Sequence, residues 1–335
     1  SSTGVYSLAM WTPNVLRDKH PNQPLDLNAT LHEGGNYRVF MAKTVTVRVP
    51  VRIDLAGGWT DVPAYCSVYK GEVINIAINR YITAEMHIDD ERRISVKYSS
   101  DMPIGSGLGT SGAMNVALLS AISGEGRTPE EIAELAFKFE DLLGNTGGRQ
   151  DQWASALGGM QHLVFEGDSV TSTPLNPSPE FLSWIERNLV LFDSGITHVS
   201  GELHEGVWGK FGIGDETVRE GLHRIRRITV EMLESIEQED KATFALSMYR
   251  GCWSVNMLGR EFNAPFERYL KPLQIEDYIM AWKVMGAGAG GVVGVLFDDG
   301  YDRKPIYDLA EKQGWTELEW AIEHQGIQRE VNLHE

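Results

Sequence analysis

The chain has 335 residues, of which 42% are hydrophobic and 23% charged, and its formal net charge at pH 7 is -17. This composition predicts a globular protein with a core large enough for one large domain or two medium ones. The negative charge argues against nucleic acids and anionic membranes as partners, because both attract positive surfaces. Two cysteines, Cys66 and Cys252, provide no disulfide framework and no cysteine metal site, so we expect a cytoplasmic protein. We expect neither a signal peptide nor a membrane-spanning segment.

The chain divides into three parts by pattern. Residues 1–40 are polar, contain three prolines and show no sustained periodicity, so we expect an N-terminal extension outside the main fold. A change of pattern near 185–190 suggests a domain boundary, with an N-terminal domain at 41–188 and a C-terminal domain at 189–335. No internal repeat is present.

The first regular element is a strand at 45–55, where apolar and polar residues alternate. The alternation predicts a half-buried strand that places Arg52 on the face opposite the apolar row. An acidic hairpin turn at 89–92 joins two later strands. Further strands are expected at 73–78, 81–88 and 93–98.

A glycine-rich loop follows these strands, beginning at Pro103 and leading into an apolar helix at 111–123. Glycines allow successive backbone N–H groups to point at one centre, and the N-terminus of the helix adds unpaired N–H groups and a positive dipole end. The loop therefore predicts a phosphate-binding site, with a hydroxyl able to reach a metal ion. The expected phosphate-binding residues are Pro103, Gly105, Ser106, Gly107, Leu108, Gly109, Thr110 and Ser111.

The next helix has a recognisable start and end. Thr128, Pro129 and Glu131 form a capping box, and Gly144 stops the helix. The expected core stripe comprises Ile132, Leu135, Ala136, Phe139 and Leu143. The second half of the chain completes an α+β pattern, with strands expected at 189–192 and 292–297 and helices at 215–238, 241–259, from about 275, and at 303–313.

Four oxygen- or nitrogen-bearing side chains suit phosphoryl transfer, which needs a phosphate cradle, a divalent cation and an activated hydroxyl. Magnesium takes few protein ligands, so Ser111 and Glu140 would suffice. Asp151 follows Glu140 across a flexible, glycine-containing connection and is a candidate general base, while Arg52 could stabilise charge on the transferred phosphate. Asp151 could also simply be the N-cap of a short helix, and the two roles are compatible.

These segments resemble the three motifs of the GHMP kinases (galacto-, homoserine, mevalonate and phosphomevalonate kinases). The first motif contains Arg52 and Asp61, the second is the glycine-rich loop, and the third is the segment 283–291. The resemblance extends over about 43–335. It implies a two-domain α+β fold, with an N-terminal lobe like domain 2 of ribosomal protein S5 and a ferredoxin-like C-terminal lobe.

The resemblance also implies an ATP- and magnesium-dependent kinase that acts on the anomeric hydroxyl of a sugar. Ser111 and Glu140 match the magnesium ligands, Asp151 the catalytic aspartate, Arg52 an arginine near the reacting groups, and Asp61 an aspartate that binds sugar hydroxyls. A kinase-like ATP-binding regulator without catalysis is the alternative from another class.

The sugar is less well defined. The run Gly57-Gly58-Trp59 is similar to fucokinases, whereas the segment 147–152 is similar both to fucokinases and to bacterial heptose phosphate kinases. Arg149 stands where heptose kinases tend to have lysine, and a cation there suits a phosphorylated sugar. The expected substrate-binding residues are Gly57, Gly58, Trp59, Asp61, Arg149 and Gly288.

We therefore place D-glycero-D-manno-heptose 7-phosphate first and L-fucose second as the substrate. Trp253 lacks the following lysine pair that a heptose kinase is expected to have. Arg149 is either a pocket residue or a surface charge, and the sequence does not decide between the two. His198 and His204 are expected at the surface or at the rim of the pocket rather than on a metal. The oligomeric state is open, with a homodimer as one alternative.

Overall fold

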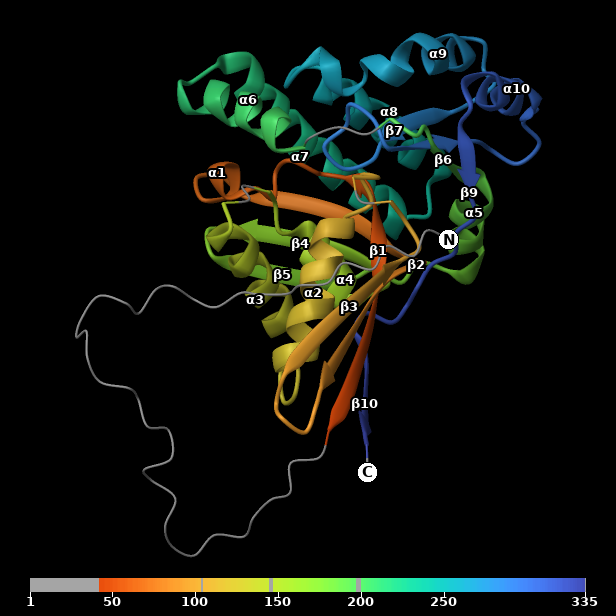
Figure 1. Cartoon of the computed structure of the whole chain (residues 1–335). Helices are drawn as coiled ribbons and strands as arrows, with labels where there is room; N and C mark the ends of the chain where they lie inside the picture. Colours follow the sequence, from red (N-terminus) through yellow and green to blue (C-terminus); the bar gives the residue numbers. More distant parts are fainter. Residues whose placement is uncertain (1–41, 104, 145–146, 197–199, 335) are drawn as a thin grey trace, which may run out of the picture.

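The structure, a computed structural model, describes residues 42–103, 105–144, 147–196 and 200–334, so the expected extension at 1–40 lies outside the described residues. It is a two-lobed α+β fold (Figure 1). The strands are β1 (Lys43–Ala56), β2 (Gly71–Ile88), β3 (Ile94–Ser100), β4 (Met160–Glu166), β5 (Ser169–Pro174), β6 (Leu189–Asp193), β7 (Ala281–Val284), β8 (Val292–Leu296), β9 (Thr316–Leu318) and β10 (Gln328–Leu333). The helices are α1 (Pro63–Cys66), α2 (Thr110–Ser123), α3 (Pro129–Leu142), α4 (Gln150–Leu157), α5 (Pro179–Asn188), α6 (Ser200–Gly212), α7 (Glu216–Glu237), α8 (Lys241–Val255), α9 (Ala264–Ile275) and α10 (Lys304–Gln313), with a short 3-10 turn η1 (Arg260–Phe262).

The first lobe is built on an antiparallel sheet in the order β10-β1-β2-β4-β5, with β3 also paired to β2. Helices α2 and α4 contact β1 from the same lobe, and α7 and α8 of the second lobe contact it as well. Because helices of both lobes enclose this strand, every residue over 49–56 is buried, including the polar Arg52 and Asp54. The expected half-buried strand is therefore wrong for this part of β1.

The second lobe has a four-stranded antiparallel sheet in the order β7-β8-β6-β9. Its core contains the large side chains of Phe266, Trp282, Phe297 and Trp315. The C-terminal strand β10 does not belong to this lobe, because it pairs with β1 in the first sheet. The continuous C-terminal domain expected at 189–335 thus begins where β6 begins but returns its last strand to the first lobe (Figure 1).

Several elements differ from the sequence-based expectation. The two strands expected at 73–78 and 81–88 are one long strand, β2, with an irregular register opposite Pro50. The helix expected to start near Ile275 instead ends there. The capping box of α3 is confirmed by both of its hydrogen bonds, between Thr128 and Glu131.

The buried face of α3 differs from the expected stripe. Leu143 lies beyond the helix as its C-cap and is exposed, whereas Glu140 is buried. The buried residues are Ile132, Ala133, Ala136, Phe137 and Glu140, so the buried face is rotated about the helix axis relative to the expected stripe. The carboxylate of Glu140 on this face accepts a hydrogen bond from Asn115 of α2. In the part of the chain that the structure describes, no helix is both long and apolar enough to cross a bilayer.

Candidate active site

A cavity of about 370 Å³ lies where the two lobes meet. Its lining comes from both lobes and from all three glycine-containing motif segments. The residues around it are Arg52, Trp59, Asp61, Val62, Gly105, Gly107, Gly109, Thr110, Ser111, Gly112, Glu140, Gly147, Gly148, Gln150, Asp151, Gln152, His204, Gly286 and Ala287.

The glycine-rich loop forms one wall of the cavity. Gly105, Gly107 and Gly109 have φ angles of 85°, 81° and 75°, in the left-handed region that glycine tolerates. Gly109 is the N-cap of α2 and provides no side-chain cap. The first N–H groups of α2 therefore have no side-chain partner from the cap, and the residues that follow, Thr110 and Ser111, line the cavity. This arrangement suits phosphate oxygens.

The third motif packs directly on the back of this loop. A Cβ on Gly107 would lie 2.6 Å from the Met285 carbonyl oxygen, and a Cβ on Gly286 would lie 2.8 Å from the Gly107 carbonyl oxygen. The Val292 N–H also donates to the Ser106 carbonyl oxygen at 2.9 Å. The glycines of the third motif thus allow two backbones to touch and so fix the shape of the glycine-rich loop.

Gly288 of the same motif lies elsewhere. It lines a smaller, adjacent cavity together with Gly58 and Lys283, and it is not among the residues around the main one. A Cβ on Gly288 would approach Phe262 at 3.0 Å. Its position supports a packing role more directly than the expected contact with substrate.

Arg52 and Asp151 form an ion pair at the centre of the site. Oδ1 of Asp151 accepts from Arg52 Nε at 2.9 Å and lies 2.6 Å from Nη2. Arg52 Nη1 donates to the Gly107 carbonyl oxygen at 2.6 Å, so the same guanidinium also holds the phosphate loop. A Cβ on Gly112 would lie 2.6 Å from the Asp151 Cβ, which explains the glycine in the first turn of α2.

Asp151 is the second residue of α4, whose N-cap is Arg149. The alternative that Asp151 is itself the N-cap is therefore wrong. A carboxylate in the first turn is nevertheless favoured by the positive end of the helix dipole. The first turn of α4 is therefore an electrostatically favourable place for the Asp151 carboxylate beside the cavity.

Glu140 and Ser111 line the same cavity as Asp151. Glu140 Oε1 accepts from Asn115 Nδ2 at 2.7 Å, and Asn115 is one helical turn after Ser111. Within the described residues, no group of three or more Asp, Glu, His or Cys side chains could enclose a metal ion. A hydroxyl and carboxylates beside a phosphate cradle fit magnesium, which prefers oxygen ligands and shares them with substrate phosphates.

Asp61 lies beside the start of α4. Its Oδ2 accepts the Gln150 N–H at 3.0 Å, and a Cβ on Gly148 would lie 1.9 Å from the same oxygen. Burial raises the pKa of Asp61 to about 7; the charges of Asp151 and Asp54 add to this increase, and the Gln150 N–H opposes it. The carboxyl group therefore changes its charge near neutral pH.

Trp59 and His204 complete the wall beside Asp61. Trp59 has a φ of 81°, which is rare for a residue with a side chain, and its ring stacks on His204 with centroids 4.5 Å apart. His204 comes from α6 in the second lobe, and Trp208 Nε1 donates to its Nδ1 at 3.4 Å. The sequence predicts His204 at the surface or at the rim of the pocket. No sequence spacing relates it to Trp59. His198 lies outside the described residues.

Arg149 is not brought to the cavity. Its guanidinium donates to the Gly167 carbonyl oxygen at 3.1 Å, lies 3.6 Å from Asp168 Oδ1, and stacks over Phe137 at 4.7 Å. The side chain is buried. Arg149 is therefore neither the pocket residue nor the surface charge that the sequence left open, because its guanidinium is buried against Phe137 of α3 and the turn at Gly167.

Comparison with known proteins agrees with this geometry. Residues 73–159 match the family model described as the GHMP kinases N terminal domain. This segment is a GHMP kinase N-terminal domain. The first and third motifs lie outside the matched residues, but the structure places both against the glycine-rich loop within them.

Two related proteins align with most of this chain, well beyond the segment that matches the family model. The chain is 28% identical to D-glycero-alpha-D-manno-heptose 7-phosphate kinase of Campylobacter jejuni, over 85% of this chain and 98% of the relative. It is 23% identical to the bifunctional fucokinase/GDP-fucose pyrophosphorylase of Arabidopsis thaliana, of which it spans only 33%.

Solved structures show the same fold. A D-glycero-D-manno-heptose 1-phosphate kinase from Bacteroides thetaiotaomicron superimposes with a TM-score of 0.67 at 20% identity, over 85% of this chain and 98% of that one. Lactococcus lactis galactokinase gives a TM-score of 0.66 at 14% identity, over 85% and 95%. The expected two-domain GHMP kinase fold is confirmed.

Proposed function

We propose that this protein is an ATP-dependent kinase that phosphorylates the anomeric hydroxyl of a sugar. The observation that supports it most directly is the Arg52–Asp151 pair, which lies in one cavity between a phosphate-binding loop and the Asp61–Trp59 wall. A carboxylate paired with a cation beside a glycine-rich loop suits the transfer of a terminal phosphate to a hydroxyl, and this supports the proposal.

Each side chain then has a defined task. The loop N–H groups and the N-terminus of α2 bind the phosphates of ATP. Asp151 accepts the proton of the sugar hydroxyl or orients that hydroxyl, and Arg52 stabilises the negative charge that develops on the transferred group. Asp61 accepts hydrogen bonds from other hydroxyls of the sugar. Magnesium, held through Ser111 and Glu140, would neutralise phosphate charge when bound.

Replacing Ser111 with alanine tests the metal part of this proposal. The variant loses one oxygen ligand and keeps the helix, so the magnesium concentration needed for half-maximal activity should rise about tenfold, the effect of roughly 1.4 kcal/mol of lost binding. A magnesium titration at saturating ATP and sugar measures it. Thr110→Ala is the matched control on the neighbouring hydroxyl, and an unchanged titration in Ser111→Ala would contradict ligation.

D-glycero-D-manno-heptose 7-phosphate remains our first substrate and L-fucose the second. The first choice is supported by likeness over nearly the whole length of the heptose kinase, whereas the fucokinase relative is matched over a third of its length. The second is supported by Trp59, whose stacked ring lines the cavity. Arg149 does not support a phosphorylated sugar, because its guanidinium faces Gly167 and Asp168.

Arg149→Ala should therefore affect phosphorylated and free sugars equally. The variant removes a buried side chain that packs on Phe137, so we expect a loss of about 1–3 kcal/mol of unfolding free energy without a change in the ratio of kcat/KM between the two substrates. Denaturant unfolding and paired kinetics measure both. A loss confined to the phosphorylated sugar would instead place Arg149 in the substrate site.

The overall proposal is tested by a coupled ADP-release assay over free and phosphorylated sugars, with the product phosphate located by NMR. Turnover with a product phosphorylated at the anomeric carbon supports the proposal. ATP binding without turnover on any sugar would favour a non-catalytic regulator.

Both cysteines are free and buried, which together with ATP as donor supports a cytoplasmic location.

A further inference from the structure

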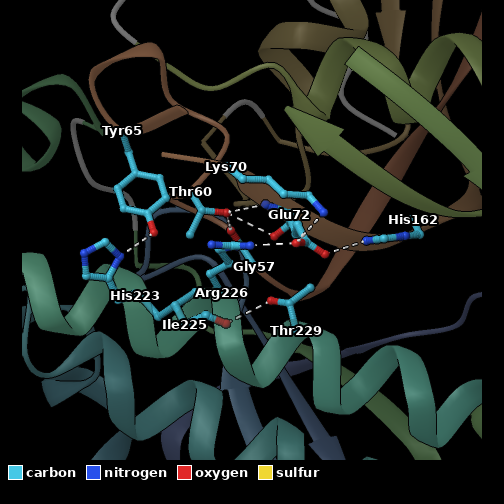
Figure 2. A network of polar contacts seen from close by, with 10 residues as sticks. All are labelled: Gly57, Thr60, Tyr65, Lys70, Glu72, His162, His223, Ile225, Arg226 and Thr229. Atoms are coloured by element: carbon cyan, nitrogen blue, oxygen red, sulfur yellow. Dashed lines mark hydrogen bonds and ion pairs between the residues drawn. The ribbon is translucent and has the colours of Figure 1, made fainter. Parts of the chain in front are cut away.

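A buried carboxylate, Glu72 of β2, lies against the turn at 57–61, which bears Trp59 and Asp61, the sugar wall of the proposed site. Its side chain is only 4% exposed and is surrounded by three basic groups. Lys70 Nζ and His162 Nε2 each lie 3.1 Å away within the first lobe, and Arg226 Nε of α7 approaches to 3.4 Å from the second lobe (Figure 2). Burial acts to raise the pKa of Glu72, but hydrogen bonds from His162 and Lys70 lower it to about 2, so the group is ionised at neutral pH.

The backbone of Glu72 holds the turn that bears Trp59 and Asp61. Thr60 Oγ1 accepts the Glu72 N–H at 3.1 Å and lies 2.7 Å from the Gly57 carbonyl oxygen and 3.0 Å from that of Glu72 (Figure 2). A Cβ on Gly57 would lie 1.9 Å from the Glu72 carbonyl oxygen. The turn and Glu72 are therefore in direct contact and must move together.

The second lobe meets this assembly at two polar points on one face of α7. Arg226 reaches Glu72, and His223, one turn earlier, has its Nδ1 2.8 Å from the Tyr65 hydroxyl (Figure 2). Between them, Ile225 joins Trp59 and Tyr65 in one apolar cluster. Apolar contact alone leaves the helix free to slide or turn, whereas hydrogen-bonded charges fix direction and distance.

From these contacts we propose that Glu72 and Arg226, assisted by Tyr65 and His223, are positioning residues that set the sugar wall of the cavity. They hold α7 at one register against the turn at 57–61, and thereby fix where Trp59 and Asp61 stand. The inference rests on the proposed sugar kinase function for its kinetic consequence, but its structural consequence does not depend on that function.

Arg226→Gln separates positioning from folding. Lys70 still forms its ion pair with Glu72 in this variant, and His162 Nε2 still lies 3.1 Å from the carboxylate, so the buried charge keeps an ionic partner. We expect the KM for the sugar to rise about tenfold, because Trp59 and Asp61 lose a fixed position for binding, while kcat and the KM for ATP change less than about twofold. Arg226→Lys should restore part of the sugar affinity.

The matched control is Arg227→Gln. Arg227 is the next residue on α7, is 59% exposed, and pairs only with Glu220 of its own helix among the described contacts. It should leave both KM values unchanged. Tyr65→Phe removes a single hydroxyl and should raise the sugar KM in the same direction as Arg226→Gln, by a smaller factor.

Hydrogen exchange provides a readout that needs no turnover. Amides at 57–62 should exchange faster in Arg226→Gln than in the parent or in Arg227→Gln, because the turn loses its tie to α7. Unchanged exchange there would overturn the inference, whether or not the protein proves to be a sugar kinase. A loss of kcat equal in size to the loss of sugar affinity would also overturn it. Faster exchange without any sugar turnover would leave the positioning role supported and the proposed function rejected.

Discussion

Replacing Asp151 with asparagine is expected to reduce kcat by about 100- to 10,000-fold, the usual contribution of a positioned general base. The amide has nearly the same shape, and its oxygen can keep the contacts that Asp151 Oδ1 makes with Arg52 Nε and Nη2. The fold and the phosphate loop should therefore be retained, and the dissociation constant of ATP should stay within about threefold of the parent value. Single-turnover kinetics and calorimetric titration with ATP measure the two effects.

The matched control for this variant is Gln152→Ala, since Gln152 lies on the next position of α4 and lines the same cavity without an ionisable group. It should lower kcat far less than Asp151→Asn. Near-normal turnover in Asp151→Asn would refute a catalytic role for the carboxylate. A loss of ATP binding in parallel with turnover would show that Asp151 acts by holding the loop through Arg52.

The second large effect concerns Asp61 and pH. Burial raises the pKa of this carboxyl to about 7, so in the free enzyme it is mostly neutral at pH 6 and mostly ionised at pH 8. An ionised carboxylate accepts stronger hydrogen bonds from sugar hydroxyls. We expect kcat/KM for the sugar to rise about tenfold per pH unit below 7 and to level off above it. Asp61→Asn should remove this rise and lower kcat/KM at pH 8.

The free energy of unfolding should fall as pH rises, opposite to the expected rise of kcat/KM. The folded pKa of Asp61 lies above its unfolded value of 3.8, so the protonated group favours the folded state. Its contribution is fully present below about pH 4 and is lost as pH rises through about 7. The Asp61→Asn variant cannot titrate at this position and has no such loss. The difference between the free energies of unfolding, variant minus parent, should therefore increase from pH 5 to pH 8. A parallel pH dependence of stability in both proteins would contradict a buried, titrating Asp61.

Local sequence determined the helix caps and turns of this protein. The capping box at Thr128 and Glu131, the helix beginning after Gly109 and the phosphate loop depend on residues close together in the chain, so their patterns are readable without a fold. The motif residues Arg52 and Asp151 were expected near one another, and the structure brings them into an ion pair. Their roles in catalysis stay predictions.

Contacts between distant segments could not be read in this way. Lys283 of the third motif forms a buried ion pair with Asp54 of the first, with Nζ 2.8 Å from Oδ2, although 229 positions separate them. His204 meets Trp59 only because α6 folds back over the first lobe. Arg149 was misjudged because its neighbours in sequence, Gly148 and Gln150, both line the cavity while its own side chain leaves in the other direction.

The glycine-rich loop, the capped helices and the three motifs were thus determined by the sequence itself, because turn geometry and helix caps depend on a few adjacent residues. Tertiary structure alone decided which side chains face the cavity, since the direction of a side chain depends on what packs around it. It also decided that β10 completes the first sheet and that Glu72 meets Arg226, because such pairings join segments whose patterns are independent of each other.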